Sequence, residues 1–270
     1  MAIKWGEPLV KGLKFAVHPK RWLLFFIIDL VFLGSAAWIV LSNLSAFTSA
    51  LVTITTDVTA VSSLLGYIAG VVVLLIVWGL LRIWAMGAII HQSFKEKDAV
   101  KKSFSISFKK YPSLLLATII IGVIAALVGW VPYIGWIISI VVGLIFFFVV
   151  QGIIVKGSGA FKAINESWKI FKGSPFKVFL MWLLIVIIGG AISLIFALPA
   201  LGMVLGLMLS AGQTTGAAAM AAVLFSVMTT PVNFVAVFVI FLVGSAVSMC
   251  FSLKAITEYY LQVRKRFKVF

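Results

Sequence analysis

The sequence predicts an all-α polytopic membrane protein with six transmembrane helices, arranged as three hairpins that are each preceded by a cytoplasmic amphipathic helix. Three observations support this fold class. Hydrophobic residues make up 63% of the chain and charged residues only 11%, an apolar share above that of soluble domains. Several apolar runs reach about 20 residues, enough to cross a membrane as helices. Basic residues gather in only some of the segments between these runs.

Hydropathy places six candidate spans along the chain. The first run is too long for the core of a signal peptide and is not followed by a small-residue cleavage site, so we expect it to remain as a span. The whole chain, residues 1–270, is predicted to form a single membrane domain. The spans are expected at residues 22–42, 64–90, 113–131, 133–155, 176–198 and 231–253.

The lysines and arginines indicate the orientation of these spans. They occur before the first span, between the second and third, between the fourth and fifth, and after the sixth. The other connections, residues 43–63, 130–133 and 199–230, contain none. Because loops rich in Lys and Arg stay in the cytoplasm, both termini are predicted to be cytoplasmic. The net charge of +15 thus lies in strips next to the membrane, which favours anionic headgroups or an acidic partner over nucleic acid.

The basic segments are also amphipathic, most clearly the one before the fifth span. Its apolar side chains recur at helical spacing, with lysines on other faces: Phe161, Ile164, Trp168 and Phe171. Each basic segment is expected to lie in the headgroup plane with its apolar side toward the membrane interior. The residues expected to bind lipid headgroups are Lys11, Lys14, Lys20, Arg21, Lys101, Lys102, Lys109, Lys110, Lys162, Lys169 and Lys172.

Each of these segments ends in the pattern Phe-x-x-x-Pro directly before an apolar run. The pattern occurs at Phe15–Pro19, Phe108–Pro112 and Phe171–Pro175. Composition alone gives about 0.6 coincidences (7 Pro × 23 Phe / 270), so three indicate an internal repeat. Each proline is expected to end the surface helix and turn the chain into the bilayer. The repeat units are predicted at about residues 9–90, 99–155 and 160–260.

The connections without lysine or arginine differ from one another. Residues 43–63 are rich in Ser and Thr, which is typical of an exposed loop, and begin with a glycosylation sequon at Asn43. The connection from Trp130 to Trp136 is predicted to be a tight turn with interfacial aromatic residues. Residues 200–230 are apolar, and are expected to form a re-entrant or interfacial hairpin or to extend the fifth and sixth spans.

Two charged residues lie clearly inside the predicted spans, Asp29 in the first and Arg82 in the second. Both lie about 12 to 14 Å from the cytoplasmic ends at the helical rise per residue. Because isolated charges in a bilayer are costly, an ion pair between Asp29 and Arg82 is expected. Two interpretations stay open, a structural clamp between the helices and a transport or coupling site.

Motifs of enzymes are absent from the sequence. It contains no phosphate-binding glycine loop and no cluster of His, Cys and acidic residues at ligand spacing. No metal and no cofactor are therefore expected. The methionines at 203, 208, 220 and 228 are interpreted as adaptable packing rather than as a metal site.

The repeat units resemble a known type of membrane protein. The resemblance lies in the three basic segments with their Phe-x-x-x-Pro endings, and in Gly87-Ala-Ile-Ile and Gly152-Ile-Ile at the ends of the second and fourth spans. These units resemble uncharacterised archaeal and bacterial six-span families that are similar to the membrane region of glycerophosphoryl diester phosphodiesterases. The resemblance implies the fold and a multi-pass protein of a prokaryotic plasma membrane. It implies no activity, because the sequence has no counterpart of their catalytic domain.

We therefore expect a non-enzymatic integral membrane protein, a structural or accessory subunit with a lipid-binding basic cytoplasmic face. Its expected partners are anionic membrane lipids, together with a protein partner or a second copy of the chain. The fourth and fifth spans carry few polar residues, which disfavours a wide hydrophilic pathway. The alternative is a transporter or channel for a small or amphipathic solute that uses Asp29 and Arg82.

Overall fold

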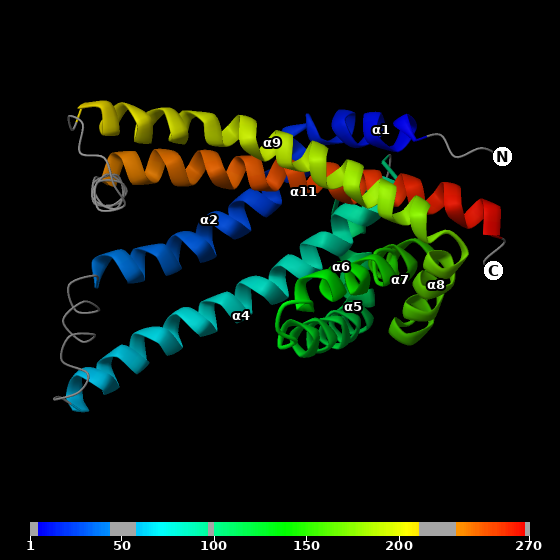
Figure 1. Cartoon of the computed structure of the whole chain (residues 1–270), viewed down its shortest axis with the longest axis horizontal. Coiled ribbons are helices and arrows are strands. Elements are labelled where there is room, and N and C mark those ends of the chain that lie inside the picture. Colours follow the sequence, from blue (N-terminus) through cyan, green and yellow to red (C-terminus); the bar gives the residue numbers. More distant parts are fainter. Residues whose placement is uncertain (1–4, 44–57, 97–99, 211–230, 268–270) are drawn as a thin grey trace. The chain divides into compact units, whose positions relative to one another are not determined.

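The computed structural model describes residues 5–43, 58–96, 100–210 and 231–267, and these residues form helices and no strands (Figure 1). The predicted all-α class with six spans is confirmed, since six helices are long and apolar enough to cross a membrane. The predicted spans overlap all six of them. Their bounds are Pro19–Ser42, Leu65–Phe94, Val100–Gly129, Gly135–Lys156, Pro175–Pro199 and Val235–Lys265.

Prolines and glycines set several helix boundaries. Three helices, α2, α9 and α11, begin at a proline, where the missing N–H leaves no hydrogen bond unmade. Gly157 follows the last residue of α7 with a φ of 77°, a left-handed conformation that glycine adopts readily. The helices are α1 (Gly6–Ala16), α2 (Pro19–Ser42), α4 (Val58–Phe94), α5 (Val100–Gly129), α6 (Gly135–Ile145), α7 (Val149–Lys156), α8 (Ala160–Gly173), α9 (Pro175–Ser210) and α11 (Pro231–Phe267).

The predicted break at the repeated proline is confirmed in two units and wrong in the third. Helix α1 ends before Pro19 and α8 ends before Pro175, so each of these prolines opens a new helix. Pro112 instead lies inside the continuous helix α5. The Gly-Ser pair before Pro175 ends a helix readily, whereas the Lys-Lys-Tyr sequence before Pro112 favours helix continuation. A proline inside a membrane helix is tolerated because local adjustments satisfy the freed carbonyl.

The fourth span is interrupted, which the sequence did not predict. Helix α6 ends at Ile145 and α7 begins at Val149, with turns between them. Ser167 of α8 bridges the interruption, because its hydroxyl donates to the carbonyl of Ile145 at 2.5 Å and accepts from the N–H of Phe148 at 3.2 Å. A side chain of another helix thus satisfies two backbone groups that the broken helix leaves unpaired.

The chain divides into two compact units. We call the first the basic unit, which consists of Met1–Trp22, Arg82–Ala191 and Val247–Phe270, and the second the apolar unit, which consists of Leu23–Leu81 and Ile192–Ala246. Every Lys and Arg of the sequence belongs to the basic unit. The single membrane domain stays a prediction.

A close helix contact of the apolar unit lies between α11 and α9, where a Cβ added to Gly244 would come within 2.6 Å of the Phe196 side chain. In contrast, the space beside Gly66 and Gly70 of α4 is open, so this Gly-x-x-x-Gly pair does not pack closely on another described helix. The buried side chains of the apolar unit include Phe25, Ile28, Asp29, Ala36, Leu242 and Ala246.

Candidate functional site

The basic segments that precede the spans have a buried face that includes several small residues. In α8, Ala163 and Ser167 are buried, whereas Phe161 and Trp168 are 70% and 43% exposed. In α5, Ser107 is buried, and its hydroxyl donates to the carbonyl of Trp84 in α4. The sequence pattern showed the apolar stripe and the lysines of α8, and the structure adds this third face.

The three phenylalanines of the repeated pattern do not share one environment. Phe15 is buried, Phe171 is half-buried and Phe108 is exposed. The internal repeat therefore stays a prediction, because its most regular residue packs differently in each unit.

Glycines let each of the three basic segments that precede a span approach the end of another span. A Cβ on Gly87 of α4 would lie 2.4 Å from a side chain of α5, and one on Gly152 of α7 would lie 3.2 Å from a side chain of α8. The sixth span has no glycine at its end. Where α1 meets this span, the glycine belongs to α1, since a Cβ on Gly12 would lie 3.0 Å from Phe251 of α11.

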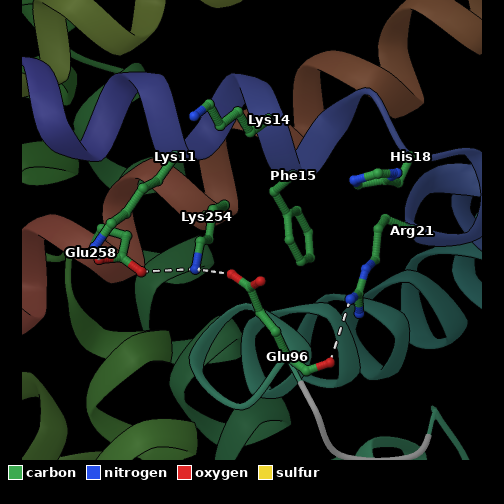
Figure 2. A pocket seen from close by; sticks show the side chains of 8 residues that line it. All are labelled: Lys11, Lys14, Phe15, His18, Arg21, Glu96, Lys254 and Glu258. Atoms are coloured by element: carbon green, nitrogen blue, oxygen red, sulfur yellow. Dashed lines mark hydrogen bonds and ion pairs between the residues drawn. The ribbon is translucent and has the colours of Figure 1, made fainter.

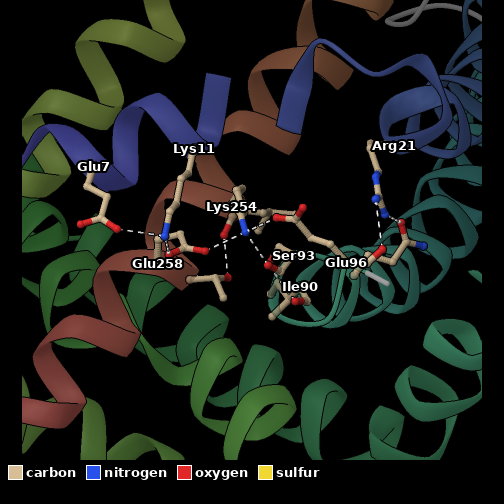
Figure 3. Close-up of polar contacts among 11 residues, drawn as sticks. Glu7, Lys11, Arg21, Ile90, Ser93, Glu96, Lys254 and Glu258 are labelled. Carbon is tan, nitrogen blue, oxygen red and sulfur yellow. Dashed lines mark hydrogen bonds and ion pairs between the residues drawn. The ribbon is translucent and has the colours of Figure 1, made fainter. Parts of the chain in front are cut away.

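Lys254 of α11 is buried, with 3% of its side chain exposed, and three oxygen atoms surround its ammonium group (Figure 3). Its Nζ donates to the carbonyl of Ser93 at 2.6 Å, to Oε1 of Glu96 at 2.6 Å and to Oε1 of Glu258 at 2.7 Å. An ammonium group has three N–H donors, and all three are used here. A buried charge is tolerated when it is both paired and hydrogen-bonded, and Lys254 meets both conditions.

This network extends from Glu258 to α1. Lys11 Nζ lies 3.0 Å from Oε2 of Glu258 and 3.0 Å from Oε1 of Glu7. The hydrogen bond to Glu258, followed by the one to Glu7, raises the pKa of Lys11 above its ordinary value. The ion pairs therefore connect α1 with α11. Through Lys254 they also connect α11 with Glu96, which lies just after the end of α4.

A pocket of about 360 Å³ lies beside this network (Figure 2). The Phe15 ring separates Lys254 on one side from Arg21 and His18 on the other. The ring centroid is 4.9 Å from the Arg21 guanidinium carbon and 5.8 Å from Lys254 Nζ. Arg21 also donates to the Gln92 side-chain oxygen at 3.1 Å. The pocket is lined by Lys11, Lys14, Phe15, His18, Arg21, Glu96, Lys254 and Glu258.

A second ion pair attaches α8 to α7. Lys156 Nζ lies 2.6 Å from Oε1 of Glu166, and the side chains of both residues are largely buried, at 12% and 8% exposure. Near the end of α4, the ring of His91 is hydrogen-bonded to Ser103 of α5 at 3.0 Å. Polar contacts therefore hold α1, α8 and the first part of α5 each to the end of a span.

The predicted headgroup-binding residues fall into two groups. Lys11, Lys14 and Arg21 line the pocket, and half-buried Lys110 donates to the carbonyl of Gly157 at 2.8 Å. The remaining residues are exposed: Lys20, Lys101, Lys102, Lys109, Lys162, Lys169 and Lys172.

Asp29 is buried in the apolar unit and accepts a hydrogen bond from the indole nitrogen of Trp78 at 2.7 Å. Trp78 was not predicted as a partner of Asp29, although an indole N–H is a suitable donor to a carboxylate inside an apolar span. Asp29 and Arg82 belong to different units, and the ion pair between them stays a prediction.

The structure describes parts of the three connections that lack lysine and arginine. The predicted turn is confirmed, since α5 ends at Gly129, α6 begins at Gly135, and Trp130 and Tyr133 are 89% and 95% exposed. Helix α9 continues to Ser210, which agrees with an extension of the fifth span over residues 200–210. The predicted loop over residues 43–63 is wrong at its end, since residues 58–63 belong to α4. Residues 44–57, residues 211–230 and the side chains of the four methionines at 203, 208, 220 and 228 lie outside the described residues.

Sequence reasoning missed the acidic partners of Lys254. Glu258 follows it by four residues on one helix, a spacing at which ion pairs form, so this signal was present. Glu96 is 158 residues away along the chain, and no local pattern connects it to Lys254. The pocket depends on such long-range contacts and could not be predicted from the sequence.

A comparison of the chain with family models, with curated proteins and with solved structures finds no match. The resemblance to six-span families therefore stays a prediction.

Proposed function

We propose that the chain is a non-enzymatic membrane protein, a structural or accessory subunit, whose basic segments bind anionic lipid headgroups at the cytoplasmic surface of a prokaryotic plasma membrane. The observation that supports this most directly is the construction of α8. Ala163 and Ser167 face the protein, Phe161 and Trp168 are exposed, and a stripe of exposed lysines lies beside them.

An exposed aromatic stripe next to lysines suits the boundary between headgroups and acyl chains. There the aromatic side chains enter the apolar region, while lysine stems extend along it and place the ammonium groups near the phosphates. Each lysine near an anionic surface contributes about 1 kcal/mol of attraction. The lysines at 162, 169 and 172 together therefore give α8 a substantial preference for anionic lipid.

The experiment is native mass spectrometry of the full chain purified with phosphatidylglycerol and phosphatidylcholine in equal amounts. The variant replaces Lys162, Lys169 and Lys172 with Gln, and the matched control replaces the same residues with Arg. We expect the Gln variant to retain less phosphatidylglycerol per protein and the Arg control to retain as much as the wild type. Equal retention by all three proteins would contradict the proposal.

A transport function is the second candidate, favoured by the buried Asp29 and its hydrogen bond to Trp78. Carboxylates inside membrane spans often belong to ion or proton pathways. Proteoliposomes loaded with a pH-sensitive dye and subjected to an imposed proton or potassium gradient separate the two functions. Gradient loss that exceeds that of empty liposomes, and that Asp29→Asn abolishes, would favour transport.

A further inference from the structure

The pocket beside Phe15 carries an excess of positive charge. Four basic residues and two acidic residues line it, which leaves two net positive charges (4 − 2) with neutral His18. Its volume of about 360 Å³ falls in the range of small-molecule sites, roughly 300 to 1,000 Å³.

Both acidic groups of the pocket are engaged by two of its basic residues. Glu258 accepts from Lys254 through one carboxylate oxygen and from Lys11 through the other. Glu96 accepts from Lys254 at 2.6 Å. The negative charges of the pocket therefore lie against Lys254 and Lys11, on one side of the Phe15 ring (Figure 2).

The other basic residues of the pocket have no acidic partner among the described residues. Arg21 donates only to neutral oxygens, the Gln92 amide at 3.1 Å and the Glu96 backbone carbonyl at 3.5 Å. A guanidinium has five N–H donors, so these two contacts leave most of its donor capacity unused. Lys14 makes no ion pair with a described residue, and its side chain is exposed.

Contacts with Phe15 and Gln92 orient the Arg21 guanidinium. The Phe15 ring lies under its guanidinium and Gln92 fixes one of its nitrogens, so its planar group is oriented before a ligand arrives. The first turn of α2, which begins at Pro19, adds the partial positive charge of a helix N-terminus beside it.

We propose that this pocket binds one phosphate group, with Arg21 as the main ligand and Lys14 and His18 as further donors. A guanidinium matches the oxygens of a phosphate through parallel hydrogen bonds, and an ammonium adds a compact charge. The phosphate belongs either to a lipid headgroup or to a soluble phosphate ester. For a lipid phosphate, the inference rests on the proposed lipid-binding function and assigns it a stoichiometric site.

The test uses the full chain and separates the two sources. In the soluble arm, inorganic phosphate is titrated by calorimetry into protein in phosphatidylcholine nanodiscs. In the lipid arm, phosphatidylglycerol is titrated in phosphate-free detergent buffer and bound molecules are counted by native mass spectrometry. We expect saturation at one equivalent in one arm, and the arm that saturates identifies the source.

The variants are Arg21→Gln and Lys14→Gln, with Lys95→Gln as the matched control, because Lys95 is an exposed lysine that adjoins Glu96, does not line the pocket and is not among the predicted headgroup-binding residues. We expect Arg21→Gln to weaken binding about tenfold or more and Lys14→Gln by roughly three- to tenfold, as for charged hydrogen bonds. Lys95→Gln should bind within about twofold of the wild type.

Lys14→Gln keeps the test decisive if Arg21→Gln does not fold, because Lys14 makes no described contact that the fold depends on. No saturable binding in either arm, or equal weakening by Lys14→Gln and Lys95→Gln, would overturn the proposal. The triple lysine variant of α8 reports separately on the proposed function. The triple variant leaves the pocket unchanged, so it should lose bulk phosphatidylglycerol and still bind one equivalent. If the bulk lipid is not lost, the proposed function fails; if the single equivalent does not bind, the pocket proposal fails.

Discussion

The basic and apolar units differ in how their side chains are used. All 22 Lys and Arg residues belong to the basic unit, where ion pairs and hydrogen bonds connect helices that are distant in sequence. The apolar unit contains no Lys or Arg, and its described contacts between helices include a single carboxylate-indole bond, Asp29 to Trp78. The difference indicates that contacts of charged side chains stabilise the packing of the basic unit in particular.

Helices in a membrane depend on particular contacts for their packing. Lipid tails are as apolar as leucine, so burial of apolar surface gives little driving force between helices in a bilayer. Close contacts at small residues and hydrogen bonds supply it instead. The basic unit has them at Gly87, Gly152 and Gly12 and around Lys254, and the apolar unit has them at Gly244 and Asp29.

The largest expected effect comes from removing the buried ammonium group of the basic unit. Lys254→Met leaves Glu96 and Glu258 without their shared cation, and we expect a loss of about 3 kcal/mol in the free energy of unfolding. Thermal or denaturant unfolding in detergent measures it. The control is Lys265→Met on the same helix, an exposed residue whose substitution should change stability by less than about 0.5 kcal/mol. Similar losses in the two variants would show that the network does not determine the packing.

Glycine substitutions should separate a closely packed helix position from an open one. In Gly87→Ala the new Cβ would lie 2.4 Å from Ser107 Oγ and 2.8 Å from Leu114, so we expect a loss of about 2 kcal/mol. Gly66→Ala in the apolar unit meets open space and should be neutral or slightly stabilising, because alanine favours a helix. Unfolding in the same detergent compares them, and a loss at Gly66 as large as that at Gly87 would contradict the comparison.

Within the apolar unit, the bond between Trp78 and Asp29 is the contact to remove. Trp78→Phe takes away the donor to a buried carboxylate, and we expect a loss of about 1 to 2 kcal/mol. The double variant with Asp29→Leu should lose less than the sum of the two single variants, because no carboxylate then needs the donor. Additive losses measured by unfolding would show that the bond contributes nothing specific.

The smallest expected effect is a pH dependence at Lys11. Its pKa is higher in the folded than in the unfolded chain, so its contribution to stability is complete below the ordinary value of 10.5 and is lost as the pH rises through the folded value. The free energy of unfolding of the wild type and of Lys11→Met is measured from about pH 9 to about pH 12, on both sides of the ordinary lysine pKa. The two curves should converge above the pKa of Lys11 in the folded chain. A stability difference that stays constant over this interval would show that the raised pKa has no structural role.

Much of the fold could be predicted from the sequence, because each span is decided by its own composition. The ends of the spans follow from prolines and charged residues, which act locally. The continuous helix at Pro112 and the interruption at Phe146–Phe148 were not predictable in this way, since the second is stabilised by Ser167 of another helix. Lys11, Lys14 and Arg21 were singled out for their charge, but the pocket that they share with Glu96 and Lys254 depends on distant parts of the chain.

The most direct measurement of the central claim is the depth of α8 in a bilayer. Spin labels on Phe161→Cys and Lys169→Cys, in liposomes that contain phosphatidylglycerol, report collisions with oxygen and with a water-soluble nickel complex. The native Cys250 is buried, so the label attaches to the introduced cysteines. We predict that the label at 161 collides mainly with oxygen, as in the acyl region, and that the label at 169 collides mainly with nickel. Equal exposure of both labels to nickel would contradict the assignment of α8 to the lipid surface.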